Sequence, residues 1–159
     1  MKKFLVICSM AIMMCMNVNA QNEWVYDYHE GDELKGIEEY YSNYYSDKNG
    51  NFFVCWNNSD VVKIGAENGI FDCRLSSYGY NAHYTVYVIV GFYKDGELIK
   101  KETAHFDVPR DKFSVAFSSR KMGKKIIKHL KETGDVRIIA SKYGKSDFDI
   151  LIPMNKYLN

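Results

Sequence analysis

Histidine and aspartate are the residues of this chain that could perform acid–base or metal chemistry, and His83 and His105 are the first pair to weigh. They stand near the outer ends of two predicted strands joined at Asp95-Gly96, so a hairpin would bring them within a residue or two of each other. Two imidazoles could begin a metal site, but no third ligand stands at a suitable spacing. We therefore expect exposed or hydrogen-bonded histidines at strand ends, with no metal and no cofactor.

A hydrolase would need two or more of a set of five side chains to converge in a pocket, namely His83, His105, Asp107, Asp147 and Asp149. Asp147 and Asp149 flank Phe148 and would project to one face of the last predicted strand, as a carboxylate pair or as two solvated side chains. The sequence contains no Gly-x-Ser-x-Gly, His-Glu-x-x-His, Cys-x-x-Cys, phosphate-loop or dinucleotide-binding motif. A small hydrolase with a site assembled from scattered residues is thus the alternative, not the expected function.

The run Tyr-Tyr-Ser-Asn-Tyr-Tyr at 40–45 is the first candidate binding surface. Strand alternation puts Tyr41 and Tyr45 on one face and Tyr40 and Tyr44 on the other, so whichever face is outside shows tyrosines. A phenol offers contact area and a hydroxyl at low entropy cost, which suits recognition of a sugar or a protein. The alternative is a strand whose tyrosines lie at the margin of the core.

A basic helix is the second candidate surface. Its polar side carries Lys124, Lys125 and Lys128 among other cations, which would suit an anionic envelope glycan, a lipid head group or an acidic partner. The alternative is a solvated face that an acidic segment of the same chain neutralises. That segment comprises Glu30, Asp32, Glu33, Glu38 and Glu39.

Short runs of aromatic and β-branched residues, separated by Gly and Asn turns, predict the strands that must position these groups. Hairpins are expected at 47–51, at 67–69 and at the Asp-Gly turn of 94–97. The first of these resembles the start of a calcium loop but lacks the bidentate glutamate such a loop needs. The longest strand, 82–93, is apolar on both faces and is expected to be central. The predicted strands cover 37–45, 52–56, 61–64, 70–75, 82–93, 98–101, 136–142 and 148–152.

One helix is predicted over 120–132. Hydroxyl residues at its start offer an N-cap, Met122, Ile126, Ile127 and Leu130 share one face, and Gly134 stands where a left-handed C-terminal cap would fall. Only two prolines interrupt the chain and no linker composition is visible, so 21–159 is expected to form a single domain. The order of elements predicts a mainly β protein. It would be an antiparallel β-sandwich or distorted barrel, with one α-helix before the last two strands closing an open end or an edge.

The first twenty residues predict a secretory signal peptide. Lys2 and Lys3 precede an apolar run of thirteen residues, and Val18-Asn19-Ala20 forms a small-residue cleavage site. The run is too short for a membrane-spanning helix, so we expect an exported protein, periplasmic or extracellular, with no transmembrane segment in its mature chain. The formal net charge is close to zero, which argues against nucleic acid as a partner.

Two cysteines, Cys55 and Cys73, remain in the mature chain. A compartment that permits oxidation allows a disulfide between them, and the other interpretation is two buried thiols. In a simple meander a third strand would separate them by roughly 9 to 10 Å, which exceeds disulfide reach. A meander that folds over between two sheets would still allow the disulfide to form.

Several segments together resemble the type VI secretion-associated periplasmic protein family. These are the start at Glu23-Trp24, the strand 52–56 that carries Cys55, Val61-Val62-Lys63-Ile64, and a late helix followed by Val136-Arg137-Ile138, Tyr143-Gly144 and Phe148-Asp149-Ile150. The chain departs from the family pattern at 88–91, where Val-Ile-Val-Gly replaces an Arg-Ile-Asp type central strand. The resemblance implies an exported β domain that accompanies envelope machinery without established catalysis.

The sequence therefore favours an exported, non-catalytic binding or accessory domain of the bacterial cell envelope, with an envelope protein or glycan as its partner. A structural subunit would instead show a bare apolar edge strand or an oligomer.

Overall fold

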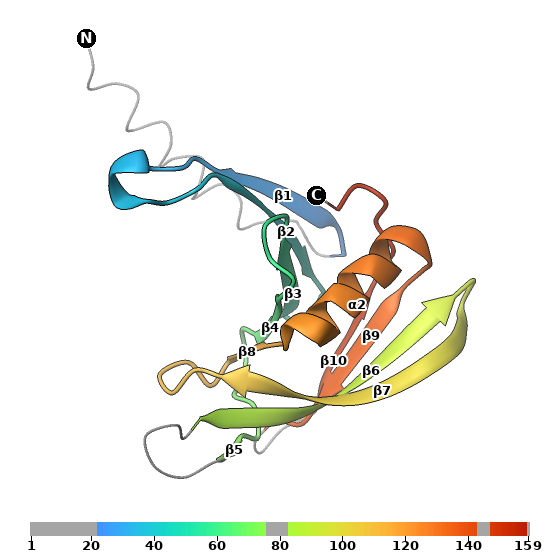
Figure 1. Ribbon diagram of the computed structural model, residues 1–159. Coiled ribbons are helices and arrows are strands. Elements are labelled where there is room, and N and C mark those ends of the chain that lie inside the picture. Colours follow the sequence, from blue (N-terminus) through green and yellow to red (C-terminus); the bar gives the residue numbers. More distant parts are fainter. Residues whose placement is uncertain (1–21, 76–82, 143–146, 159) are drawn as a thin grey trace.

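The computed structural model describes residues 22–75, 83–142 and 147–158 (Figure 1). The predicted signal peptide, 1–20, lies outside these residues. A short 3-10 helix, η1 (Glu33–Lys35), and one α-helix, α2 (Arg120–Glu132), accompany ten strands in the described part of the chain. The strands are β1 (Trp24–His29), β2 (Tyr40–Ser46), β3 (Asn51–Trp56), β4 (Val62–Ala66), β5 (Arg74–Leu75), β6 (Tyr84–Lys94), β7 (Glu97–Val108), β8 (Val115–Phe117), β9 (Val136–Ala140) and β10 (Phe148–Ile152).

These strands form one antiparallel sheet that curls into a half-barrel around α2 (Figure 1). The strand order is β1-β2-β3-β4-β8-β7-β6-β9-β10, and β5 pairs with β6. The curl brings β1 and β3 close to the last strand. Asn51 Nδ2 of β3 donates to the Asp149 carbonyl of β10 at 3.2 Å, and Trp24 Nε1 of β1 donates to the Pro153 carbonyl just after β10 at 3.1 Å. The prediction of a mainly β, antiparallel fold with one α-helix before the last two strands is confirmed, and a distorted barrel describes it.

Helix α2 has the predicted bounds and supplies the apolar side chains that cover the inner face of the sheet. The Ser119 side chain caps its start by accepting from the Met122 amide at 3.3 Å. Met122, Ile126 and Leu130 are buried, and the helix packs against β4 and β9. The helix therefore closes the open side of the half-barrel.

The left-handed cap predicted at Gly134 is wrong. The residues with positive φ in the described chain do not include Gly134. A Cβ at this position would lie 2.2 Å from the Tyr93 carbonyl oxygen, so the position needs glycine because the backbone of β6 passes against it.

Two of the three predicted hairpins are confirmed, and the third is wrong. The turns at 47–51 and 94–97 join β2 to β3 and β6 to β7, with Gly50, Asp95 and Gly96 at positive φ. The segment 67–69 joins no hairpin, because β4 pairs with β3 and β8 whereas β5 pairs with β6. The edge of β4 that was predicted to pair with 70–75 pairs instead with β8, which lies far along the chain.

Strand β6 is central, as predicted, since it pairs with β7 on one side and with β9 and β5 on the other. Its inner face, Val86, Val88, Val90 and Phe92, lies in the core. Its second apolar face has no layer of the described structure packed on it, and Tyr87 on that face is exposed.

Cys55 and Cys73 are both free thiols, so the disulfide alternative does not describe this structure. Cys55 is buried on the inner face of β3, and burial raises the pKa of its thiol to about 12. Cys73 is half-buried and its thiol donates to the Phe71 carbonyl at 3.2 Å. Burial also raises the pKa of Cys73. Both groups are therefore protonated and poorly nucleophilic at neutral pH.

Candidate binding surfaces

Of the groups proposed for hydrolysis, the structure brings His83 and Asp107 together but keeps the two histidines apart. His105 lies opposite Tyr87 in the β6–β7 register, so His83 stands four residues away, roughly 13 Å along the strand. The hairpin therefore does not bring the two histidines within a residue or two of each other, because the register pairs His105 with Tyr87 and not with a residue next to His83. His83 Nε2 lies 3.6 Å from Asp107 Oδ1 at an exposed strand end. No cluster of three metal-ligating side chains occurs among the described residues.

Two other acids, Asp149 and Asp47, form hydrogen bonds that fix local structure. Asp149 of β10 accepts two hydrogen bonds from Arg137 of the neighbouring strand β9, at 2.8 Å from Nε and 2.6 Å from Nη2. Asp47 accepts from the amides of Asn49 and Asn51 at 2.8 and 3.0 Å, which makes 47–51 a hairpin turn. Asp147 is exposed at the start of the last strand.

A cluster of Asp27, His29 and Ser42 on the outer face of β1 and β2 was missed by sequence reasoning. Its members meet only through the pairing of these strands, in which Asp27 lies opposite Ser42. His29 Nε2 lies 3.2 Å from Ser42 Oγ and 3.3 Å from Asp27 Oδ2. A catalytic triad needs the carboxylate on Nδ1, where it orients the ring that activates the hydroxyl. Because both partners share one nitrogen, this cluster cannot activate Ser42 in that way.

The four predicted tyrosines divide between core and surface. Tyr45 is buried against Trp24, with ring centroids 5.6 Å apart, and Tyr44 is half-buried on Phe52. Tyr40 is half-buried and stacks on the His29 ring at 4.3 Å. Tyr41 alone of the four is exposed, at 40%. The tyrosines therefore serve the core margin as well as a surface.

Tyr41 belongs to a larger exposed surface that includes two tyrosines of β1. Tyr28 packs on Tyr41 with ring centroids 5.0 Å apart, and Tyr26 lies on the same face of β1. Both are exposed. Strand β1 was not among the predicted strands. The signal that could have found it is the aromatic residue at every second position, 24, 26 and 28.

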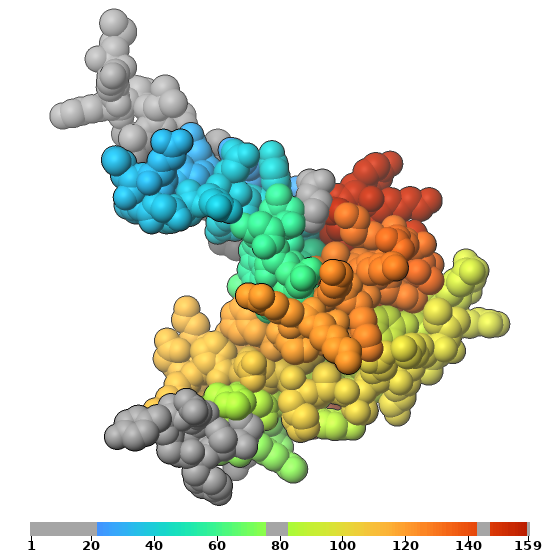
Figure 2. Space-filling view, in the orientation of Figure 1, coloured from blue at the N-terminus to red at the C-terminus, as the bar shows by residue number. Residues whose placement is uncertain are grey.

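We call residues 23–41 the acidic arm. They form β1, η1 and the start of β2, and they project from the body of the molecule (Figures 1 and 2). Leu34 and Ile37 are exposed near its tip. Lys35 is its one lysine or arginine, against the acids Glu23, Asp27, Glu30, Asp32, Glu33, Glu38 and Glu39.

Two of the three predicted lysines of the basic helix, Lys125 and Lys128, are in ion pairs within the protein, so they are less available to a partner. Lys125 Nζ lies 2.7 Å from Glu102 of β7, which also pairs with Lys100 at 2.7 Å. Lys128 lies 3.9 Å from Glu132, and Lys124 is exposed. The acidic segment predicted to neutralise this helix lies in the arm, and no ion pair joins it to α2 among the described residues. The predicted neutralisation by that segment is therefore wrong, because the fold places Glu102 beside the helix instead. The exposure of Lys124 and Lys128 is compatible with a solvated face.

Replacing Glu102 with glutamine is expected to lower the free energy of unfolding at neutral pH by about 1 kcal/mol or less. Lys100 and Lys125 hold the pKa of this carboxyl below its ordinary value. Its contribution is therefore full above the unfolded pKa of about 4.3 and is lost as pH falls through the folded pKa. Urea titrations at neutral and acid pH measure this. Glu97→Gln, an exposed change on the same strand, is the control, and an equal loss in both variants at neutral pH would contradict the ion pairs.

Comparison with protein-family models, with curated proteins and with solved structures finds no match for this chain. The resemblance to the type VI secretion-associated family thus stays a prediction. Within the described residues, no helix has the length and apolar composition needed to cross a bilayer.

Proposed function

We propose that this protein is an exported, non-catalytic binding domain of the bacterial cell envelope, and that the acidic arm binds its partner protein. The observation that carries the proposal is the row of exposed tyrosines, Tyr26, Tyr28 and Tyr41, beside an open strand edge. The predicted signal peptide and the outline resemblance to an envelope-associated family support the location.

The open edge belongs to β1, the first strand of the sheet. It pairs with β2 on one side, and no described strand pairs with its other side. Such an edge presents backbone N–H and C=O groups that can pair with an extended segment of another protein. Tyr26 and Tyr28 would lie beside alternate side chains of that added strand.

The charge of the arm indicates the chemistry of the partner. Its acids greatly outnumber its bases, so an extended segment rich in lysine and arginine would be attracted and an acidic one repelled. The tyrosine rings add stacking with such cations. The partner class is therefore a basic, extended segment of an envelope protein. Most of this attraction should be screened by salt, because the acids are exposed.

Site-specific photocrosslinking in cells that produce the protein tests this function. A photoreactive amino acid at Tyr28 is compared with the same residue at Tyr87, which is a matched tyrosine on a strand of the outer face, 49% exposed against 48%. We expect one dominant adduct from position 28, with the crosslink mapped to a basic segment, and no such adduct from position 87. An identical adduct from both positions, no adduct at 28, or a crosslink to an acidic segment would contradict the proposal.

A further inference from the structure

The outer face of the sheet departs from the usual pattern around β6 and β9. A sheet with one face in solvent normally points polar side chains outward. Strand β7 follows this rule at Lys101, Thr103 and His105, although Leu98 near its start is apolar on the same face. Its neighbours do not, because Ile89 and Tyr93 of β6 and Ile139 of β9 share that face. Leu151 of β10 extends the apolar area and is exposed.

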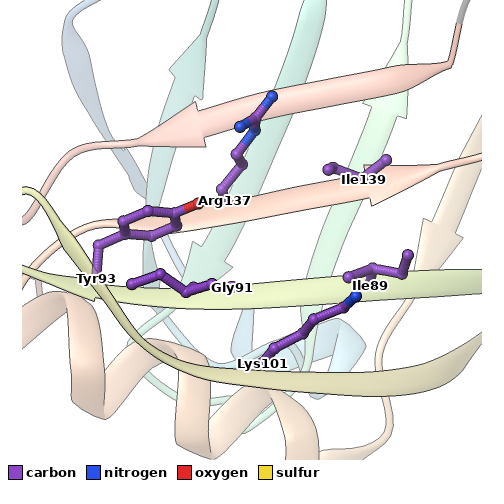
Figure 3. A pocket seen from close by; sticks show the side chains of 7 residues that line it. Ile89, Gly91, Tyr93, Lys101, Arg137 and Ile139 are labelled. Carbon is purple, nitrogen blue, oxygen red and sulfur yellow. The ribbon is translucent and has the colours of Figure 1, made fainter.

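A hollow of about 190 Å³ lies within this apolar area (Figure 3). Gly91 forms its floor, since the missing side chain leaves a depression between Ile89 and Tyr93. A Cβ at this position would lie 3.0 Å from Tyr93 Cε2 and 3.2 Å from Leu98 Cδ1. The hollow is smaller than the roughly 300 Å³ at which pockets for drug-sized ligands begin, so it suits one short chain or one ring.

Two cations flank the floor of the hollow. Lys101 lies opposite Gly91 on β7, and Arg137 lies opposite Gly91 on β9, so all three stand in one row across the sheet. Arg137 is held by the two hydrogen bonds to Asp149, and Figure 3 shows the Tyr93 hydroxyl beside it. Lys101 has no ion-pair partner among the residues that the structure describes. One uncompensated positive charge therefore stands beside an apolar floor.

We propose that this hollow binds a small carboxylate that carries a compact apolar group. The carboxylate lies between Lys101 and Arg137, and the apolar part lies over Ile89, Leu98 and Ile139. The single uncompensated charge matches a monoanion. Asp149 opposes a ligand of higher negative charge, because it stands beside Arg137. The site is on different strands from the acidic arm, so its ligand is independent of the protein partner.

Hexanoate is the probe that tests this site. Hexan-1-ol, which has the apolar chain without the carboxylate, and acetate, which has the carboxylate without the chain, are the controls. NMR titration of isotope-labelled protein follows the backbone amides of β6, β7 and β9. We expect hexanoate to shift the Gly91 amide and its neighbours saturably. Hexan-1-ol and acetate are expected to bind at least about tenfold more weakly, since each lacks one of the two contacts. Equal affinity for hexan-1-ol and hexanoate would overturn the proposal, as would shifts centred away from Gly91.

Lys101→Met removes the free charge and keeps the length of the side chain. It is expected to weaken hexanoate binding by about tenfold, whereas Lys124→Met on the exposed side of α2 leaves it unchanged. Gly91→Ala fills the floor and should weaken binding while Lys101 remains. Equal affinity in Lys101→Met and Lys124→Met would overturn the assignment. Substitution of Tyr28 leaves this titration unchanged, which separates the test from that of the acidic arm.

Discussion

Replacing Leu130 with alanine is expected to lower the free energy of unfolding by about 2–5 kcal/mol. The Leu130 side chain is 0% exposed and lies in the last turn of α2, where it fills the inside of the curled sheet. The backbone carbonyl of Leu130, which alanine keeps, accepts from the Asn155 amide at 2.9 Å and fixes the C-terminal segment to the helix. Truncation leaves a cavity that the rigid sheet cannot close. Urea denaturation measures the loss.

Leu34→Ala is the matched control for this variant. It removes the same atoms from a side chain that is 100% exposed in the acidic arm, so its effect on unfolding is expected to stay within about 0.5 kcal/mol. If the two variants unfolded at the same urea concentration, α2 would not be the element that holds the half-barrel together.

Gly123→Ala is expected to destabilise the protein by about 1–3 kcal/mol. Alanine at an open helical position would instead stabilise by up to about 1 kcal/mol. The sign reverses because a Cβ at 123 would lie 2.0 Å from the Asp60 carbonyl oxygen and 2.7 Å from Ser118 Oγ. Ser118 Oγ accepts from the Val62 amide at 3.0 Å, so the clash reaches the contact between the helix start and β4. Urea denaturation again provides the measurement.

Lys124→Ala is the control for Gly123→Ala, since position 124 is next in the helix and exposed. Its unfolding free energy is expected to remain within about 0.5 kcal/mol of the parent. A Gly123→Ala variant more stable than the parent protein would show that α2 does not approach the 57–61 loop as closely as the structure has it.

Local features of the fold were predictable because their causes are local. The bounds of α2 follow from the Ser119 cap and the spacing of Met122, Ile126 and Leu130. The turns at 47–51 and 94–97 follow from residue types that tolerate positive φ, Gly50, Asp95 and Gly96, and from an aspartate that accepts from nearby amides. These signals lie within a few residues of the element they define.

Features that depend on distant pairing were not predictable in this way. Strand β8 has only three residues, and nothing near them indicates that they lie beside β4. The requirement for glycine at 134 comes from the backbone of Tyr93, far away in the sequence. The same holds for Glu102, whose position beside Lys125 depends on how β7 runs past the helix.

The candidate surfaces also differ in whether local sequence or distant strand pairing determines them. The tyrosine run predicted a surface, and Tyr41 lies on one, but its companions Tyr26 and Tyr28 depended on the unrecognised β1. The apolar second face of 82–93 is visible in the sequence, where it predicts a central strand. The hollow at Gly91 needed the register of three strands, which places Lys101 and Arg137 on either side.

The pairing of β4 with β8 has a consequence for how this chain folds. The β2–β3–β4 meander and the β6–β7 hairpin each close over short loops, so both can form early. The ladder that joins them, from Lys63 to Phe117, must close a much longer loop for only three residue pairs. We therefore expect the association of the two halves to be the late and rate-limiting event, with the edge of β4 unpaired in a partly folded chain until it occurs.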